Sequence, residues 1–183
     1  MTATVEPSEF KFVSFDADLI ASIADGLVDV LGIDRPVHVI VDEATPLART
    51  RTEIGDTITI RVESGAFEDA RQPRHQSELS TAATLARALL RARDRISGGF
   101  GEAPADDDLD LRQIAAWEVY CVGRMERLGV PVNPQRWKYN FRNRHGFNDT
   151  ADMAFDRIWT ADGLSWGELE AISTAGATEG APA

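Results

Sequence analysis

The fold of this chain is decided by residues 36–62, which read PVHVIVDEATPLARTRTEIGDTITIRV. The stretch opens with PVHVIV, a β-branched run that predicts a strand buried on both faces, and Pro46 marks the end of that strand. Residues 57–62 alternate, with isoleucine and valine on one face and threonine and arginine on the other. This alternation predicts a second, half-buried strand.

Helical patterns lie on both sides of these strands. Before them, apolar residues recur at helical spacing over 16–31, and Gly32 stands where a helix C-cap is expected. After them, residues 63–76 contain glycine and proline and predict a loop with a short edge strand near 66–68. A long helix is predicted over 77–95, with Leu79 on its apolar face.

The second half of the chain is predicted to be helical. Helices are expected over 111–128, from Pro134, from Asn148 or Thr150 through Ile158, and from a capping box formed by Ser165 and Glu168. Trp117 and Trp137 lie on apolar stripes and are expected to be core residues. The predicted fold class is α+β, with a small mixed sheet packed against several helices and a helical second half.

The predicted domain organisation is simple. We expect a flexible N-terminus over 1–10, a single α+β domain over 11–173 and a disordered tail over 174–183. A mobile acidic loop is expected at about 98–110. No apolar run approaches 18 residues and no secretory signal begins the sequence, so we expect a cytoplasmic protein with no membrane partner.

Charge is distributed in blocks of alternating sign. The net charge is −11, yet residues 71–95 carry 6 basic and 2 acidic side chains and residues 119–147 carry 6 and 1. A net charge this negative argues against nucleic-acid binding by the whole surface. The basic blocks therefore indicate local surfaces or local ion pairs.

The common catalytic and metal-binding motifs are absent from the sequence. His38, His75 and His145 are at least 37 positions apart, and Cys121 is the single cysteine. No G-x-S-x-G and no phosphate-binding G-x-x-x-x-G-K-[ST] occurs. We therefore assign no catalytic residue, no metal ligand and no cofactor, and we expect Cys121 to be a buried thiol.

Residues 134–147, PQRWKYNFRNRHGF, interleave basic and aromatic side chains. This pattern can bind phosphates or a protein partner. The candidate binding residues are Arg136, Lys138, Tyr139, Arg142, Arg144 and His145. In the alternative interpretation the aromatic residues pack inward, and the basic residues pair with acidic neighbours at 106–110 or 149–156. Arg87, Arg91 and Arg95 are similarly expected to form a solvated helix face.

The order of a helix, the PVHVIVDEATP strand, the TITIRVES strand, a loop and a long helix resembles the small zincin-like metallopeptidases over about residues 16–95. In that family the long helix carries H-E-x-x-H. This sequence has Ala86-Arg87-Ala88-Leu89-Leu90 there, with no histidine and no glutamate. The resemblance therefore implies a metal-free relative that has lost peptidase chemistry.

Two functional hypotheses follow. The first is a non-catalytic cytosolic protein that binds a protein or a phosphate-bearing partner through the surface at 136–145. The second is a hydrolytic enzyme that uses carboxylates, with or without the assistance of a metal, and its candidates are Glu78, Glu118 or the cluster at 106–110. Stoichiometric zinc in the purified protein would favour the second hypothesis.

Overall fold

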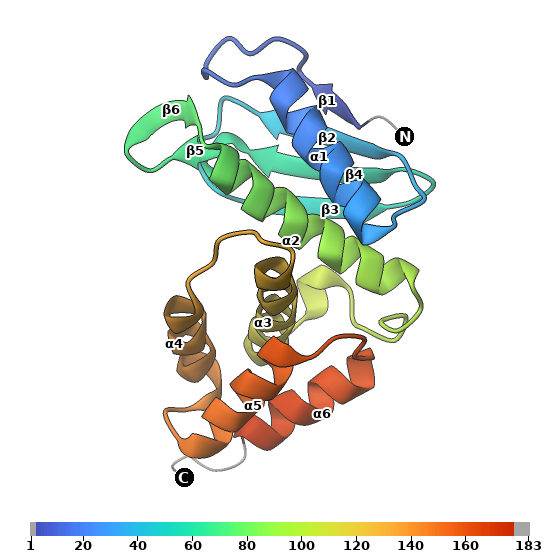
Figure 1. Cartoon of the computed structure of the whole chain (residues 1–183), viewed down its shortest axis with the longest axis vertical. Helices are drawn as coiled ribbons and strands as arrows, with labels where there is room; N and C mark the ends of the chain where they lie inside the picture. Colours follow the sequence, from blue (N-terminus) through green and yellow to red (C-terminus); the bar gives the residue numbers. More distant parts are fainter. Residues whose placement is uncertain (1–2, 178–183) are drawn as a thin grey trace. The chain divides into compact units, whose positions relative to one another are not determined.

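The computed structural model describes residues 3–177 and has the predicted α+β fold class (Figure 1). Contacts divide the chain into two compact units, Met1–Arg93 and Asp94–Ala183, with the boundary inside one long helix. The single domain over 11–173 stays a prediction. Residues 1–2 of the expected flexible N-terminus and residues 178–183 of the expected tail lie outside the described residues.

The first unit is built on a four-stranded mixed sheet with the order β1-β2-β4-β3. Strands β1 (Thr4–Glu6), β2 (Val37–Asp42) and β4 (Ile58–Glu63) run parallel, whereas β3 (Thr50–Ile54) is antiparallel to β4. The sequence analysis predicts β2 and β4. It does not predict β1, which lies in the segment expected to be flexible, or β3.

The two central strands share one buried face. Val39 of β2 is in register with Ile60 of β4, and both side chains are fully buried. The alternate residues of β2 are less covered, since His38 and Ile40 are half-buried. The prediction that β2 is buried on both faces is therefore wrong, because only one face is completely covered.

Helix α1 (Ala17–Leu31) lies across that sheet (Figure 1). The Asp16 side chain caps its N-terminus by accepting hydrogen bonds from two backbone amides, and Gly32 ends it in the left-handed region with φ 63°. Its buried side chains recur at helical spacing and are Ile20, Ala24, Val28 and Leu31. This stripe provides the apolar cover that the sheet needs.

The segment expected to be a loop after β4 contains regular structure. A 3₁₀ turn (Ser64–Ala66) leads into a small hairpin of β5 (Glu68–Asp69) and β6 (Gln72–Gln76). Helix α2 (Glu78–Ile96) follows and buries Leu85, Leu89 and Leu90. Leu79 is 49% exposed, so its expected place on the buried face is wrong.

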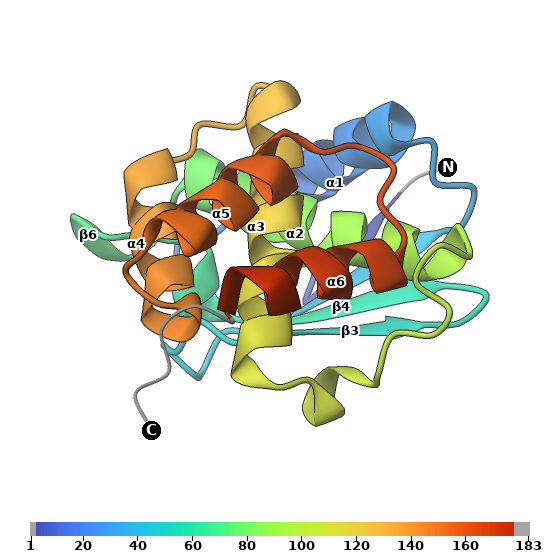
Figure 2. The same cartoon turned by 90° about the horizontal axis from the view of Figure 1, so that it is seen from below.

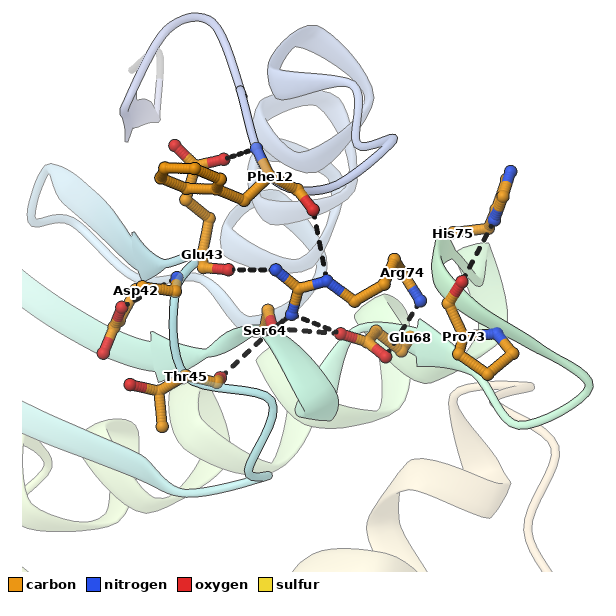
Figure 3. Close-up of polar contacts among 10 residues, drawn as sticks. Phe12, Asp42, Glu43, Thr45, Ser64, Glu68, Pro73, Arg74 and His75 are labelled. Atoms are coloured by element: carbon orange, nitrogen blue, oxygen red, sulfur yellow. Dashed lines mark hydrogen bonds and ion pairs between the residues drawn. The ribbon is translucent and has the colours of Figure 1, made fainter.

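Arg74 connects four segments of the first unit (Figure 3). Its guanidinium donates to the carbonyls of Phe12 and Glu43, to the Ser64 hydroxyl and to the Glu68 carboxylate. Its own backbone is in the left-handed region, with φ 67°, which is uncommon for a residue with a side chain. The arginine thus connects these loops, and all three nitrogens of its guanidinium already donate to acceptors of the protein.

As far as residue 177, the second unit consists of helices and loops without a strand (Figure 2). A 3₁₀ turn (Asp106–Asp108) precedes α3 (Leu111–Arg127), and α3 contacts the three helices that follow it. These are α4 (Pro134–His145), α5 (Asp149–Thr160) and α6 (Trp166–Ala177). Helix α6 continues four residues beyond the predicted end of the domain at residue 173.

Gly123 permits the close packing of α3 against α5. A Cβ atom at this position would collide with the backbone carbonyl of Trp159, and a backbone atom cannot move aside as a flexible side chain can. Elsewhere on α3 the core contains large side chains, with Trp117 and Tyr120 both buried. Phe100 from the acidic loop packs between them, with its ring centroid 4.9 Å from that of Trp117.

A buried ion pair lies beside this aromatic cluster. The Asp94 carboxylate accepts two hydrogen bonds from the Arg124 guanidinium, both 2.7 Å, and one from the indole nitrogen of Trp117 at 2.8 Å. Both charged side chains are at most 7% exposed. Burial lowers the pKa of Arg124, but the hydrogen bonds to Asp94 and the electrostatic attraction of Asp94, Cys121 and Tyr120 together outweigh it and raise that pKa above its ordinary value, so the arginine stays charged.

Candidate functional site

Helix α4 carries the basic and aromatic segment, and its boundaries follow from the sequence. The Asn133 side chain accepts a hydrogen bond from the amide of Arg136, and Pro134 occupies the first turn, where its missing N–H costs nothing. Gly146 ends the helix with φ 114°. The segment is therefore a helix with distinct faces, and its six candidate binding residues do not share one environment.

Two of the candidates, Lys138 and Arg142, are engaged by carboxylates of α5. Arg142 makes a two-pronged contact with Asp152, in which its Nε donates to Oδ1 at 2.7 Å. The Lys138 ammonium lies 3.3 Å from Asp156 and 3.5 Å from Asp152. The alternative interpretation, in which basic residues pair with carboxylates at 149–156, is confirmed for these two residues.

The electrostatics of the Arg142–Asp152 pair favour the charged forms of both side chains. The hydrogen bond to Asp152 raises the pKa of Arg142, and the same hydrogen bond is the main reason that the pKa of Asp152 is lowered. Both groups thus stay ionised and neutralise each other near neutral pH. A ligand phosphate at Arg142 would have to compete with a carboxylate that is already in place.

His145 is a buried residue rather than a surface contact, because it is only 4% exposed. Its ring stacks on Phe141, with centroids 3.7 Å apart. Nδ1 lies 3.2 Å from the Phe141 carbonyl, which can only accept, so Nδ1 carries the proton; Nε2 then accepts from the Ser173 hydroxyl at 2.8 Å. Placing His145 on a ligand surface is therefore wrong.

The other three candidates, Arg136, Tyr139 and Arg144, are exposed. Tyr139 is 58% exposed and meets the ring of Phe147, itself 63% exposed, edge to face with centroids 5.8 Å apart. Among residues 3–177, neither Arg136 nor Arg144 pairs with a carboxylate. These three side chains remain available to a partner.

An apolar groove lies between α3 and α4. Its volume is about 180 Å³, and it is lined by Leu111, Ile114, Ala115, Glu118, Val119, Trp137, Asn140, Phe141 and Arg144. Leu111 is 57% exposed, and Trp137 is only half-buried. The expectation that Trp137 is a core residue is therefore wrong, whereas Trp117 is fully buried as expected.

Arg112 is a residue of this site that the sequence analysis missed. Its Nε donates to the backbone carbonyl of Arg144 at 3.1 Å, which places its guanidinium at the C-terminal end of α4. Within the described chain Arg112 forms no ion pair with a carboxylate. Only a three-dimensional argument finds it, because it lies 32 residues from Arg144 and in an acidic block of the sequence.

The carboxylates proposed for hydrolysis are distributed over separate places. Asp106 pairs with Arg95 at 2.6 Å, and Asp110 caps α3 through the amides of Arg112 and Gln113. Glu78 lies exposed in the first turn of α2, and Glu118 lines the groove. Among residues 3–177, no group of three or more histidine, cysteine, aspartate or glutamate side chains could hold a metal ion.

The remaining residues that the sequence analysis singled out make contacts that support the fold. Cys121 is fully buried, with its sulfur 3.6 Å from an Arg124 nitrogen, so the expectation of a buried thiol is confirmed. Arg95 is only partly exposed and also donates to the Pro104 carbonyl at 2.8 Å. It therefore fastens the acidic loop instead of forming a solvated face. The mobility of that loop stays a prediction.

The chain matches no protein-family model, no characterised protein and no solved structure. Between residues 3 and 177, none of the helices has the length and apolar character that crossing a bilayer requires.

Proposed function

We propose that this is a non-catalytic cytosolic protein that acts by binding a partner protein at the surface formed by α3 and α4. The observation that carries the proposal is the apolar groove, with Leu111 and Trp137 partly exposed in it. Exposed large apolar side chains gathered in a groove are typical of places where a partner contributes the missing cover.

The size of the groove favours a protein partner over a small molecule. Pockets for cofactors and drug-sized ligands usually have volumes of about 300–1,000 Å³. The groove, at about 180 Å³, is smaller than that. It suits one or two apolar side chains of a peptide segment.

A phosphate-bearing partner receives less support. Of the four basic candidates on α4, Lys138 and Arg142 already face the carboxylates of Asp152 and Asp156. Only Arg136 and Arg144 remain, and they lie eight residues apart on the helix. Because a helix rises about 1.5 Å per residue, the Cα atoms of these two arginines lie roughly 12 Å apart along the helix, so both side chains would have to bend toward each other to share one phosphate.

The proposal also includes the resemblance of the first unit to the zincin-like family. The first unit has the expected order of a helix, a strand, a second strand of the same direction and a long helix, with β3 inserted between the strands. Ala86, Leu89 and Leu90 of the long helix are buried apolar side chains, where that family places zinc ligands. We therefore include in the proposal that the protein is a metal-free relative.

Elemental analysis of the purified protein tests this part of the proposal. We expect less than about one tenth of a zinc ion per chain, since a zinc site needs three or four protein ligands. About one tightly held zinc per chain would contradict the proposal and favour the hydrolytic alternative.

Selection from a peptide library tests the binding function. A display library of random twelve-residue peptides is panned on the full chain, and enriched peptides are measured by fluorescence anisotropy. We expect them to bind the parent and Val30→Ser equally and to lose at least about tenfold in affinity for Leu111→Ser, because apolar burial drives the contact. Val30 is a matched control, since it is 67% exposed on α1.

Two outcomes would count against this function. One is that no peptide is enriched, and the other is that the enriched peptides bind Leu111→Ser as tightly as the parent. A parallel titration with inorganic phosphate addresses the other partner class. Saturable phosphate binding that is lost in Arg144→Gln would favour a phosphate-bearing ligand instead.

A further inference from the structure

The groove between α3 and α4 has a positively charged end. Arg112 begins α3 and Arg144 lies in the last turn of α4, and the hydrogen bond from Arg112 Nε to the Arg144 carbonyl joins these two places. The two helices therefore run in opposite directions along the groove. Leu111 and Arg144 line one end of it, and Trp137 lies toward the other.

The charges at this end are not balanced by the protein itself. The nearby carboxylate is Asp110, whose Oδ1 accepts hydrogen bonds from the amides of Arg112 and Gln113 as a helix cap. Neither guanidinium forms an ion pair within residues 3–177, although the chain has 30 acidic residues against 19 basic ones. By contrast, Lys138 and Arg142 on the same helix both face carboxylates.

The other end of the groove has a different polarity. Glu118 lines it two turns along α3 from Leu111, about 10 Å at a rise of 1.5 Å per residue. Of the remaining lining residues Asn140 is polar, and the others, Ile114, Ala115, Val119 and Phe141, are apolar or aromatic. A segment lying in the groove would thus meet the guanidinium groups of Arg112 and Arg144 at one end only. This position of the positive charge favours one direction for a segment with a negative charge at one end.

Building on the proposed function, we infer that the partner segment carries an acidic side chain or a C-terminal carboxylate next to a large apolar anchor. The carboxylate lies against Arg112 and Arg144, and the apolar anchor lies against Leu111 and Trp137. A carboxylate suits this place because guanidinium groups bind it through paired, charge-assisted hydrogen bonds. Steering by the two charges also selects acidic segments over neutral or basic ones.

The inference is tested with the same peptide library on three proteins. The parent and the double variant Arg112→Gln/Arg144→Gln are panned in parallel, and Arg49→Gln/Arg71→Gln is the matched control. The control also removes two exposed arginines, both in the first unit and outside the α3–α4 surface. Thermal melting of all three proteins confirms that each is folded, and exposed substitutions of this kind should change stability little.

We expect the parent and the control to enrich peptides that carry Asp, Glu or a free C-terminus within a few residues of Trp, Phe or Leu. We expect the double variant to enrich apolar anchors without acidic neighbours. For one enriched peptide, changing its acidic residue to the amide should weaken binding to the parent about tenfold and leave binding to the double variant unchanged. The difference in affinity between the acidic peptide and its amide should become smaller at high salt, because salt screens the charges.

The outcomes separate the two proposals. If peptides are enriched through the groove but show no acidic preference, the binding function stands and the inference is wrong. If acidic peptides are enriched equally by the double variant, the carboxylate binds elsewhere and the inference is again wrong. If nothing is enriched, both the function and the inference fail.

Discussion

Two arginine–aspartate pairs in the helical unit have the same chemistry and opposite surroundings. Arg124 and Asp94 are at most 7% exposed and are joined by two hydrogen bonds of 2.7 Å. Arg142 and Asp152 make a similar two-pronged contact, but their side chains are 35% and 25% exposed. A buried charge without a partner destabilises the fold strongly, so each member of the first pair depends on the other. Solvent screens the second pair, which therefore contributes little to the free energy of unfolding.

The buried pair gives the largest predicted effect. Asp94→Ala leaves the Arg124 guanidinium charged and buried without its carboxylate, and it also removes the acceptor of the Trp117 indole. We expect a loss of about 3–5 kcal/mol in the free energy of unfolding, measured by urea denaturation.

A double variant distinguishes the lost pair from a simple loss of packing. Asp94→Leu/Arg124→Met removes both charges at similar volume and should recover much of the stability that Asp94→Ala loses. A double variant as unstable as Asp94→Ala would show that the pair itself is not the source of the effect. Asp106→Ala, which removes a 49% exposed carboxylate, is the control and should cost less than about 1 kcal/mol.

The second largest predicted effect concerns Trp117, which is buried, and Trp137, which is half-buried. Trp117→Ala creates a cavity in the core and should cost about 3–5 kcal/mol. Trp137→Ala should cost clearly less, because its side chain is only half-buried at the groove. Melting curves of the two variants measure the difference. Equal losses would show that Trp137 supports the core and would weaken its assignment to a binding groove.

Charge reversal on α4 separates a structural arginine from a surface one. Arg142→Glu places a third negative charge beside Asp152 and near Asp156, so we expect a loss of about 1–2 kcal/mol. Arg144→Glu has no carboxylate beside it among residues 3–177 and should change stability by less than about 0.5 kcal/mol. If Arg144→Glu proves the more destabilising variant in urea, the assignment of the two arginines must be exchanged.

The sequence predicted helices and strands better than it predicted which residues contact one another. The helix over 16–31 and the strand over 57–62 were found because their apolar periods are regular, and Gly32 marks the end of the helix. Strand β3, TRTEI, was missed because its inner positions are only half-buried and two of the three are threonine, which leaves a weak alternation. Its place is set by pairing with β4, an interaction that a local pattern does not contain.

The candidate site shows the same limit. The basic and aromatic pattern of residues 134–147 identified a surface, and the predicted alternative identified the carboxylates at 149–156 that neutralise part of it. The pattern could not show that His145 faces Ser173 or that Arg112 reaches the end of α4, because both contacts join residues about 30 positions apart. Long-range contacts of this kind depend on how the helices pack.

The smallest predicted effect concerns pH and arises at His145. Burial lowers the pKa of this imidazole, and the positive charge of Arg112 on α3 lowers it further, although the Phe141 carbonyl and Asp110 oppose both effects. Because the folded-state pKa lies below the unfolded value of about 6.5, the unfolded chain binds the proton more tightly. His145 therefore contributes stability that is fully present above about pH 6.5 and is lost as the pH falls through that value toward the folded pKa.

Denaturation in urea at pH 7.5, 6.5 and 5.5 should thus show the parent becoming less stable with falling pH. His145→Gln, which keeps a hydrogen-bonding side chain that cannot be protonated, should flatten the dependence. An NMR titration of the His145 ring should give a pKa below 6.5. A pKa above that value would reverse the sign of the effect and would mean that the cation is stabilised where α4 meets α6. Asp152 adds a separate loss only at more acidic pH, below about 4, because its pKa is also lowered.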